Sequence, residues 1–251
     1  METSLKNERP FRFIEFSVYH RQSSMKVGID AVLIGAWGKV EGNYGLDIGC
    51  GCGILSLMAA QRNKKAKILA LDIDDLSVSE AQNNFNLSPW KSRLKAIHCD
   101  VNEYVRNCKP EKLTSYDFII SNPPFFSSGI ITPTTRREKA RHSGSLSPQK
   151  LIEIGFKLLK EGGTLSMIMD VESMENINYM NKFNVEKICS VANKPLSDPK
   201  RIMLVLKKTD KGDIKKQEIK YDNLYIRDLN GDYSQRYKEL TKEFYLKGAL
   251  D

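Results

Sequence analysis

The sequence lacks any hydrophobic run long enough to cross a membrane. Its longest apolar stretches, among them residues 118–120, 165–169 and 202–206, are short, whereas a membrane-spanning helix needs about 20 apolar residues. The first ten residues, METSLKNERP, contain no hydrophobic core of a secretory signal. We therefore expect a cytoplasmic protein without a membrane partner.

Metal ligands and paired cysteines are also scarce. The chain has three histidines, and none stands at HExxH spacing, so we expect no metal site. Its five cysteines form an odd, irregular set that suits reduced thiols better than a disulfide framework. They are Cys50, Cys52, Cys99, Cys108 and Cys189.

Composition and length fit one α/β domain. The 251 residues are 41% hydrophobic and 28% charged, which is ordinary for a globular protein with a sizeable core. No internal repeat is evident. We divide the single domain into a lead-in segment (1–42), a core of sheet and helices (43–206) and a C-terminal extension (207–251).

Strand-like and helix-like segments alternate through the core, which predicts a mostly parallel, doubly wound sheet with an antiparallel strand pair at its end. The expected strands are 46–48, 67–71, 94–99, 116–121, 164–169, 185–191 and 202–206. The expected helices are 55–62, one from about 75 to 85 and one from 148 to about 161, with a last helical piece at 234–246. Asp74 or Asp75 and Ser147 are the expected N-caps, and Gly162-Gly163 the expected stop of the third helix. The polar run 207–220 indicates an exposed hairpin or linker.

A glycine-rich turn, Asp47 to Gly53, lies between the first strand and the first helix, where α/β sheets bind nucleotide-like ligands. It does not match the dinucleotide fingerprint G-x-G-x-x-G, because Ile54 occupies the place of the third glycine. Asp47 also disfavours a dinucleotide ligand, because its negative carboxylate would repel the negative pyrophosphate. A sulfonium ligand with a free amino group needs no third glycine and carries no phosphate for Asp47 to repel, so this turn suits it. The simpler alternative is a glycine turn without a function.

Two further acids end the next strands. Asp72 is placed to accept hydrogen bonds from two ribose hydroxyls, and Asp100 to accept one from an adenine amino group. Either carboxylate could instead be a helix cap. Together with Asp47, they outline one site shaped for an adenosine.

The tetrapeptide Asn122-Pro123-Pro124-Phe125 follows the fourth strand. An exocyclic adenine amine is a poor nucleophile, because its lone pair is delocalised into the ring. An Asn side-chain oxygen and a backbone carbonyl that accept its two N–H groups favour the pyramidal nitrogen that attacks a methyl sulfonium. Pro123 fixes the local backbone, and Phe125 offers a face on which the base stacks. The alternative is a Pro-Pro turn that ends a buried strand.

Positive charge gathers after this tetrapeptide. The net charge is +8, and residues 101–150 contribute half of it. A basic run in a loop-like stretch consists of Arg136, Arg137, Lys139, Arg141 and His142. Phosphate contacts beside a splayed base are one interpretation, and a solvated loop is the other.

The chain resembles the class I methyltransferases of the amino type, and more narrowly the bacterial tRNA1(Val) adenine-N(6) methyltransferases. The resemblance rests on segments spread from end to end of the chain. They are Met25–Leu33, Leu46–Gly53, Ser88-Pro89-Trp90, Asn122–Phe126, Ala140-Arg141-His142 and Leu240–Leu246. The DxGxGxG turn is common to all such enzymes and the NPP-aromatic motif to several subgroups, so the N-terminal segment and the Phe-Tyr-Leu ending narrow the choice.

The resemblance implies a Rossmann-like class I methyltransferase fold and methyl transfer from S-adenosylmethionine to a tRNA adenosine directly 3′ of the anticodon. It implies no stable protein partner. Cofactor contacts are implied for Lys26, Asp30, Asp47, Gly49, Gly51, Gly53, Asp72, Asp100 and Asn122. Asn122 to Phe125 would hold the target base, and Lys26 and Asp30 would close the pocket. Phe125 departs from the tyrosine of many relatives, which puts a hydroxyl contact in doubt but leaves stacking intact.

Other functions remain to be weighed. The NPP-aromatic motif also occurs in rRNA guanine-N(2) methyltransferases and in release-factor glutamine methyltransferases, but 251 residues leave little room for the second domain of the former or the helical domain of the latter. A DNA amino-methyltransferase uses the same chemistry, although no separate sequence-reading domain is evident. The missing G-x-G-x-x-G disfavours a nicotinamide-dependent oxidoreductase. A non-enzymatic RNA-binding or cofactor-sensing module is disfavoured by the presence of Asn122.

Overall fold

The computed structural model contains one large sheet that runs through the molecule. It describes residues 9–23, 25–108, 113–123, 146–179, 183–209 and 219–250. The strands are β1 (Phe11–Arg12), β2 (Ser17–Val18), β3 (Tyr44–Ile48), β4 (Lys67–Asp72), β5 (Leu94–His98), β6 (Tyr116–Ser121), β7 (Leu159–Asp170), β8 (Phe183–Ala192), β9 (Arg201–Lys208) and β10 (Lys220–Tyr225). The helices are α1 (Ile29–Trp37), α2 (Ile54–Arg62), α3 (Asp75–Leu87), α4 (Val101–Asn107), α6 (Pro148–Leu158), α7 (Val171–Glu175) and α8 (Gln235–Thr241).

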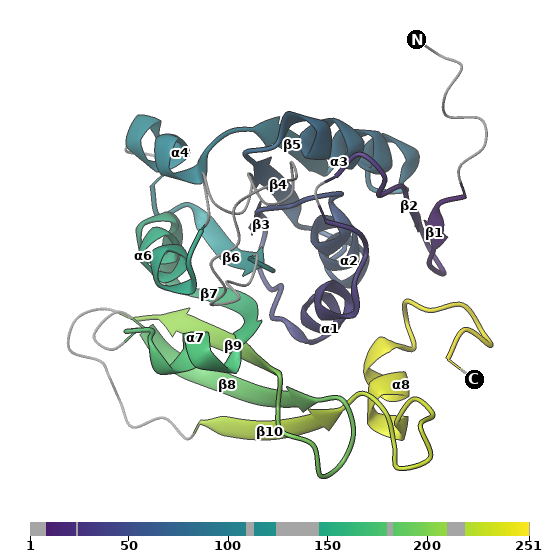
Figure 1. Ribbon diagram of the computed structural model, residues 1–251. Coiled ribbons are helices and arrows are strands. Elements are labelled where there is room, and N and C mark those ends of the chain that lie inside the picture. Colours follow the sequence, from purple (N-terminus) through teal and green to yellow (C-terminus); the bar gives the residue numbers. More distant parts are fainter. Residues whose placement is uncertain are drawn as a thin grey trace, which may run out of the picture.

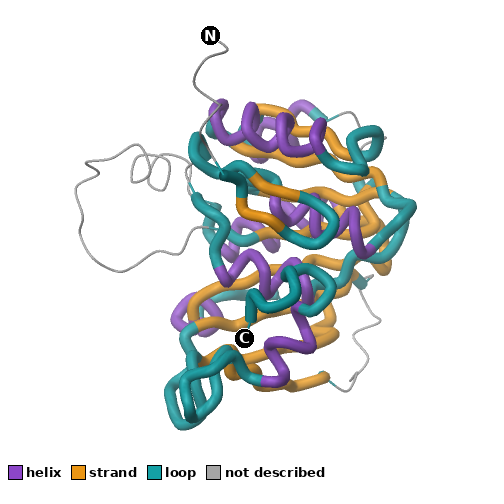
Figure 2. The backbone as a smooth tube through the Cα atoms, turned by 90° about the vertical axis from the view of Figure 1, so that its right-hand side faces the viewer, coloured by secondary structure: helices purple, strands orange, loops and turns teal. Residues whose placement is uncertain are grey.

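The large sheet has the order β10-β8-β9-β7-β6-β3-β4-β5. All of its strand pairings are parallel except those of β9, which runs antiparallel to both β7 and β8. The expected parallel sheet with an antiparallel pair is therefore confirmed. Figure 2 shows the strands stacked from one end of the molecule to the other.

Helices cover both faces of the sheet, because neighbouring residues of a strand point to opposite sides. On β6, Phe118 and Ile120 join the core beneath α1, α2 and α3, whereas Ile119 joins the core beneath α6. Figure 1 shows α1 and α2 on one side of the strands and α4 and α6 on the other. This arrangement sends the loops that follow β3, β4, β5 and β6 to one edge of the sheet.

Local sequence signals set most helix starts. The Asp74 carboxylate accepts from the Ser77 backbone N–H at 3.0 Å and caps α3. Ser147 caps α6 in the same way through the N–H of Lys150, with Pro148 at the first helical position. Both caps agree with the sequence predictions.

The structure differs from the sequence predictions in several elements, and it contains β1, β2, α1, α4 and α7, which were not expected. Gly162-Gly163 does not stop α6, which ends at Leu158; the two glycines lie inside β7, where Gly162 has a φ of +75°. The last helical piece is shorter than expected, since α8 ends at Thr241. The sheet gains an unexpected strand, β10, whose six residues pair parallel with Lys187–Ala192 of β8.

The two ends of the described chain pack against each other. The Ile14 backbone N–H donates to the Phe244 carbonyl at 2.8 Å, and the rings of Phe13 and Tyr245 lie 5.9 Å apart. Phe13 also stacks on Phe16, which contacts Trp90 edge-on. An aromatic cluster therefore fastens the β1–β2 hairpin beside α8.

Candidate functional site

The candidate site lies at the edge of the sheet where β3, β4, β5 and β6 end. The parallel registers place Ile48 opposite Leu71, Asp72 opposite His98, and Asp47 opposite Ile120. Ligands of open α/β sheets bind at this carboxyl edge. The fold thus brings the acidic segments and the Asn-Pro-Pro segment to one edge.

The glycine turn opens toward solvent at two of its three glycines. Gly49 and Gly51 have φ values of +71° and +53°, which side-chain-bearing residues rarely adopt, and a Cβ built on either would meet no atom within 4 Å. Gly53 differs, because a Cβ there would lie 2.5 Å from the Phe85 ring. Gly53 therefore allows close packing of the turn against α3, while Gly49 and Gly51 leave room for a ligand.

Asp72 braces the turn. Its Oδ2 accepts from the Gly51 backbone N–H at 2.8 Å, and its Oδ1 accepts from the Asp74 N–H at 2.9 Å. Burial raises the pKa of this carboxyl, and the two backbone hydrogen bonds oppose that shift. Each oxygen keeps a second lone pair, so the carboxylate can still accept from a ligand hydroxyl.

Asp47 is fully buried and only half satisfied. Its Oδ2 accepts from the Ser56 backbone N–H at 3.0 Å and from the Ser56 hydroxyl at 2.7 Å, whereas Oδ1 has no hydrogen-bond partner among the described residues. Burial raises the pKa of Asp47 to about 7, against the hydrogen bonds from Ser56. A buried acceptor without a partner is costly, and Oδ1 therefore marks a place for a ligand donor.

Asn122, directly after the neighbouring strand β6, also has a buried side-chain oxygen without a described partner. Its Oδ1 is buried and has no hydrogen-bond partner in the described part of the chain. The preceding residue, Ser121, ends β6 and donates its hydroxyl to the Ile48 carbonyl at 2.7 Å, which ties the strand end to β3. Pro123 is buried directly after it. The end of β6 is thus fixed with an acceptor that nothing in the described chain satisfies.

Asp100 caps a helix. Its Oδ1 accepts from the backbone N–H of Asn102 at 2.7 Å and from the Asn102 side chain at 3.0 Å, at the start of α4. The cap alternative is therefore realised, and a contact of the other oxygen with a cofactor stays a prediction.

Lys26 and Asp30 are the predicted site residues of the N-terminal segment and α1. Lys26 is exposed. Asp30, in the first turn of α1, accepts from Arg201 Nε at 3.1 Å, which links α1 to the first residue of β9. Contacts of Lys26 or Asp30 with a cofactor stay predictions.

Two buried polar residues of α3 hold the N-terminal segment beside the glycine turn. The Glu80 carboxylate accepts from the backbone N–H groups of Arg21, Gln22 and Ser23 at 2.8, 3.0 and 2.8 Å. Asn84, fully buried, pairs with both the N–H and the carbonyl of Tyr19 and also donates to the carbonyl of Cys52. Asn84 therefore joins the N-terminal segment to the glycine turn.

The sequence alone did not single out these residues, nor Ser56 and Arg201. For α3 a signal was present, because Ser77, Glu80, Ala81, Asn84 and Phe85 have the spacing of one helix face, and all of them are buried. Polar side chains on a buried face need partners, and that requirement could have drawn attention to Glu80 and Asn84.

Several predicted site residues lie outside the described residues. They are Pro124, Phe125, Arg136, Arg137, Lys139, Arg141 and His142. In the part of the chain that the structure does describe, no cluster of His, Cys, Asp or Glu side chains could hold a metal ion, and no helix is long and apolar enough to span a bilayer.

Comparison with known proteins agrees with this geometry. The methyltransferase small domain family matches residues 30–194. The chain is 38% identical over 242 residues to a tRNA1(Val) (adenine(37)-N6)-methyltransferase of Flavobacterium psychrophilum, covering 94% of this chain and 99% of the relative. It is 36% identical to a protein of the same name from Bacteroides thetaiotaomicron, with 94% and 97% covered.

Solved structures share the fold at low sequence identity. A predicted O-methyltransferase from Agrobacterium tumefaciens superposes with a TM-score of 0.66 at 17% identity, covering 86% of this chain and 96% of the other. A 16S rRNA N2 G1207 methyltransferase from T. thermophilus, in complex with AdoMet and guanosine, gives 0.52 at 21% identity, with 80% and 50% covered. At these identities the likeness concerns the fold alone.

Proposed function

Since the chain belongs to the methyltransferase small domain family and to the tRNA1(Val) adenine-N6-methyltransferases, we propose that it methylates N6 of adenosine 37 in tRNA1(Val). The methyl donor is S-adenosylmethionine. The observation that carries this proposal is the buried, unpartnered Oδ1 of Asn122 at the end of β6. An acceptor in this position suits a target that brings an N–H group, as an exocyclic amine does.

The carboxyl edge of the sheet fits the cofactor. The unpartnered Oδ1 of Asp47 offers an acceptor for its amino group, and the open space before Gly49 and Gly51 admits it close to the backbone. Asp72 retains lone pairs for the ribose hydroxyls. When bound, S-adenosylmethionine supplies an electrophilic methyl group on a sulfonium.

The residues of the chain act by binding and orienting the amine. Asn122 Oδ1 accepts from one N–H of the adenine amine, and a backbone carbonyl of the Asn-Pro-Pro segment accepts from the other. Both hydrogen bonds strengthen as the nitrogen becomes pyramidal, so they stabilise the transition state more than the ground state. Pro123 restricts the backbone. No general base is required before transfer, because the neutral amine is the nucleophile.

The remaining contacts are proposed from the sequence. Phe125 stacks on the target base, worth about 1–3 kcal/mol. The basic run Arg136 to His142 contacts phosphates on either side of the splayed nucleotide. Lys26 and Asp30 complete the cofactor pocket on the N-terminal side. Gly53 contacts the cofactor through its backbone, and Asp100 contacts it through the carboxylate oxygen that does not cap α4.

The test is single-turnover methyl transfer to tRNA1(Val) transcripts that carry adenine or guanine at the position after the anticodon. We expect only the adenine transcript to be methylated. Replacing Asn122→Ala should slow transfer by about 100-fold to 1,000-fold, as for other groups that act on developing charge, and change binding of S-adenosylhomocysteine little. Asn223→Ala, at an exposed position of β10, is the matched control and should behave as the unaltered protein. Equal methylation of the guanine transcript, or wild-type rates for Asn122→Ala, would overturn the proposal.

A further inference from the structure

A recess lies at the edge of the sheet opposite the candidate site, where β3 and β4 begin. The linkers α1–β3 and α2–β4 form one wall, and the beginnings of β8 and β10 form the other. Its volume is about 740 Å³. Six cationic and two anionic side chains line it, so positive charge prevails. The cations are Lys39, Arg62, Lys64, Lys65, Lys187 and Lys220.

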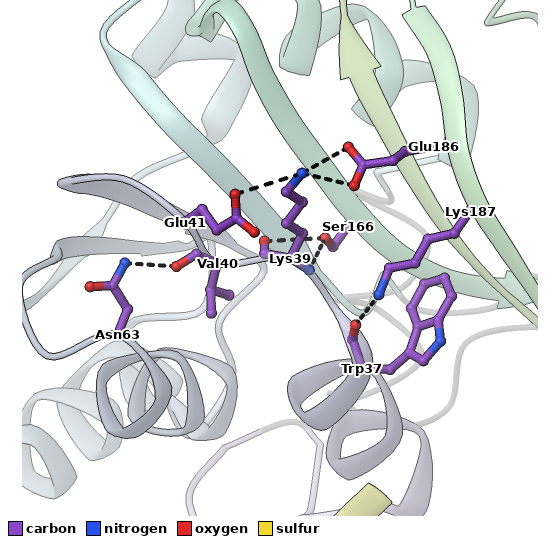
Figure 3. A network of polar contacts seen from close by, with 8 residues as sticks. All are labelled: Trp37, Lys39, Val40, Glu41, Asn63, Ser166, Glu186 and Lys187. Carbon is purple, nitrogen blue, oxygen red and sulfur yellow. Dashed lines mark hydrogen bonds and ion pairs between the residues drawn. The ribbon is translucent and has the colours of Figure 1, made fainter. Parts of the chain in front are cut away.

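One of these cations is neutralised within the fold. Lys39 Nζ lies 2.8 Å from Glu186 and 3.7 Å from Glu41, which are the two acids of the recess. Figure 3 shows Lys39 between both carboxylates, next to Ser166. The acids that line the recess are therefore already paired with Lys39, and the other five cations form no ion pair with them.

Lys187 and Arg62 are partly buried and directed at neutral groups. Lys187 Nζ donates to the Trp37 carbonyl at 2.7 Å and lies 3.9 Å above the Trp37 ring (Figure 3). Arg62 Nη1 donates to the Gly35 carbonyl at 2.8 Å. Neither forms an ion pair within the described chain. Carbonyl and ring contacts orient the two cations but do not neutralise them.

The pKa of Lys187 is lowered by its burial and by its cationic neighbours. Burial, followed by the neighbouring charge of Arg62, lowers the pKa to about 8, and the acid Glu186 offsets only part of the shift. Lys64, Lys65 and Lys220 are exposed around the opening. An anion in the recess would relieve the repulsion among these cations.

We propose that this recess binds phosphate groups of the tRNA backbone, as a second contact distant from the reacting base. The inference rests on the proposed function for the identity of the RNA. No aromatic side chain occurs among the described residues that line the recess, so it offers no surface for stacking a base. A lining rich in lysine and arginine and without an aromatic side chain is typical of contacts that position a nucleic acid through its phosphates.

The distance between the two edges suits one continuous RNA. The five residues of β3 separate the glycine turn from the recess by about 16 Å, at about 3.3 Å per residue. A nucleic-acid duplex carries a phosphate on each strand every few Å of axis, about 3.4 Å in DNA, so this distance corresponds to roughly five nucleotides of a stem. A stem that leaves the reacting adenosine can therefore reach the recess.

The test compares the full-length protein with a triple variant of exposed residues, Lys64→Ser, Lys65→Ser and Lys220→Ser. Binding of tRNA is measured over a series of salt concentrations in the presence of S-adenosylhomocysteine. We expect the Kd to rise about tenfold near physiological salt, and the salt slope to fall by about 1 for every phosphate that the variant no longer neutralises. The rate of methyl transfer at saturating tRNA should not change.

The matched control removes three exposed lysines elsewhere: Lys91→Ser, Lys95→Ser and Lys157→Ser. Lys91 lies just before β5 and Lys95 lies on β5, at the other end of the sheet, and Lys157 lies on α6. This variant should retain the tRNA affinity. If both triple variants lower affinity and slope equally, the recess is an ordinary part of a basic surface and the proposal is wrong.

Lys187→Gln and Lys187→Arg test the buried cation. The Gln variant should weaken tRNA binding and the Arg variant should largely preserve it, with melting temperatures measured for both.

Titration with inorganic pyrophosphate distinguishes the source of the phosphate. Tight pyrophosphate binding combined with unchanged tRNA affinity in the lysine variants would assign the recess to a free anion and overturn the RNA contact. Because these measurements do not depend on turnover, they can fail independently of the methylation test.

Discussion

Asp47 is a carboxyl group of the candidate site whose ionisation the fold alters strongly. Burial raises its pKa to about 7, and the charge of Asp72 adds to that shift. In the ligand-free protein, stability therefore falls as the pH rises from the unfolded-state pKa of 3.8 toward 7, because only the unfolded chain ionises fully in that range. A cationic donor at Oδ1 has the opposite preference, since it favours the ionised carboxylate.

Cofactor binding should accordingly depend on pH. If the cofactor's ammonium group donates to Asp47, the affinity for S-adenosylhomocysteine is complete above pH 7 and falls by up to about tenfold per pH unit below it. Calorimetry in buffers of different ionisation enthalpy should detect proton release on binding at about pH 6.5, just below that pKa. Asp47→Asn should bind more weakly and release no proton from this group. Affinity that is independent of pH in the unaltered protein would contradict the assignment.

The sequence predicted residues whose role is local and missed those whose role depends on distant partners. Asp47 lies near the end of β3 and Asn122 directly follows β6. Both belong to short motifs, so their places at the carboxyl edge could be inferred from spacing. The spacing of α3 could mark Glu80 as a buried acid in need of donors, but not identify those donors, because they are N–H groups 57 to 59 residues earlier in the chain.

Helix α3 acts as a clamp on the N-terminal segment. Hydrogen bonds to a charged carboxylate contribute about 1.5–3 kcal/mol each, and Glu80 accepts three from consecutive backbone N–H groups. Asn84 hydrogen-bonds both to Tyr19 of this segment and to the Cys52 carbonyl, and so holds the segment next to the glycine turn. The segment before α1 is thereby aligned with the glycine turn, where we propose that the cofactor binds.

Glu80→Gln should loosen this alignment without removing the side chain. One carboxylate oxygen becomes an NH2 group that faces backbone donors, so we expect the KM for S-adenosylmethionine to rise about tenfold while kcat at saturation changes little. Hydrogen exchange at Arg21 to Ser23 should accelerate in the same variant. Glu103→Gln, on the exposed face of α4, is the control. A fall in kcat with unchanged KM would refute a positioning role for Glu80.

Elements with strong local signals were predicted well, and elements stabilised by distant contacts were not. Strand β6 was predicted at its observed bounds, because a run of apolar residues ends in the motif. The β1–β2 hairpin has only two residues in each strand and gains its stability from Tyr245 and Phe244. Strand β10 is mostly exposed and of mixed polarity, so its place beside β8 could not be read from its own sequence.

At the scale of the molecule, the ends of the described chain pack together against α1 and α2. Phe244 is 1% exposed in the core shared with α1 and α2, and its carbonyl accepts from Ile14. We therefore propose that the lead-in segment, the core and the C-terminal extension act as a single domain.

Phe244→Ala tests this dependence. Loss of a fully buried aromatic side chain should lower the free energy of unfolding by about 3–5 kcal/mol. It should also weaken S-adenosylhomocysteine binding, because the N-terminal segment loses part of its support. Leu246→Ala, at a residue 44% exposed, should have little effect on either quantity. Chemical denaturation and calorimetry measure both, and a destabilised Phe244→Ala protein with unchanged affinity would separate the extension from the pocket.

The contact between Ile14 and Phe244 also imposes an order on biosynthesis. The hairpin that contains Ile14 leaves the ribosome before its partner Phe244, which is made 230 residues later. At about 5–20 residues per second, the early hairpin waits on the order of ten seconds or more for Phe244 and Tyr245. During that interval the sheet and α3 can form, while the aromatic cluster at the ends of the chain cannot. A nascent chain therefore forms the contacts of Ile14 with Phe244 and of Phe13 with Tyr245 only after residue 245 has left the ribosome.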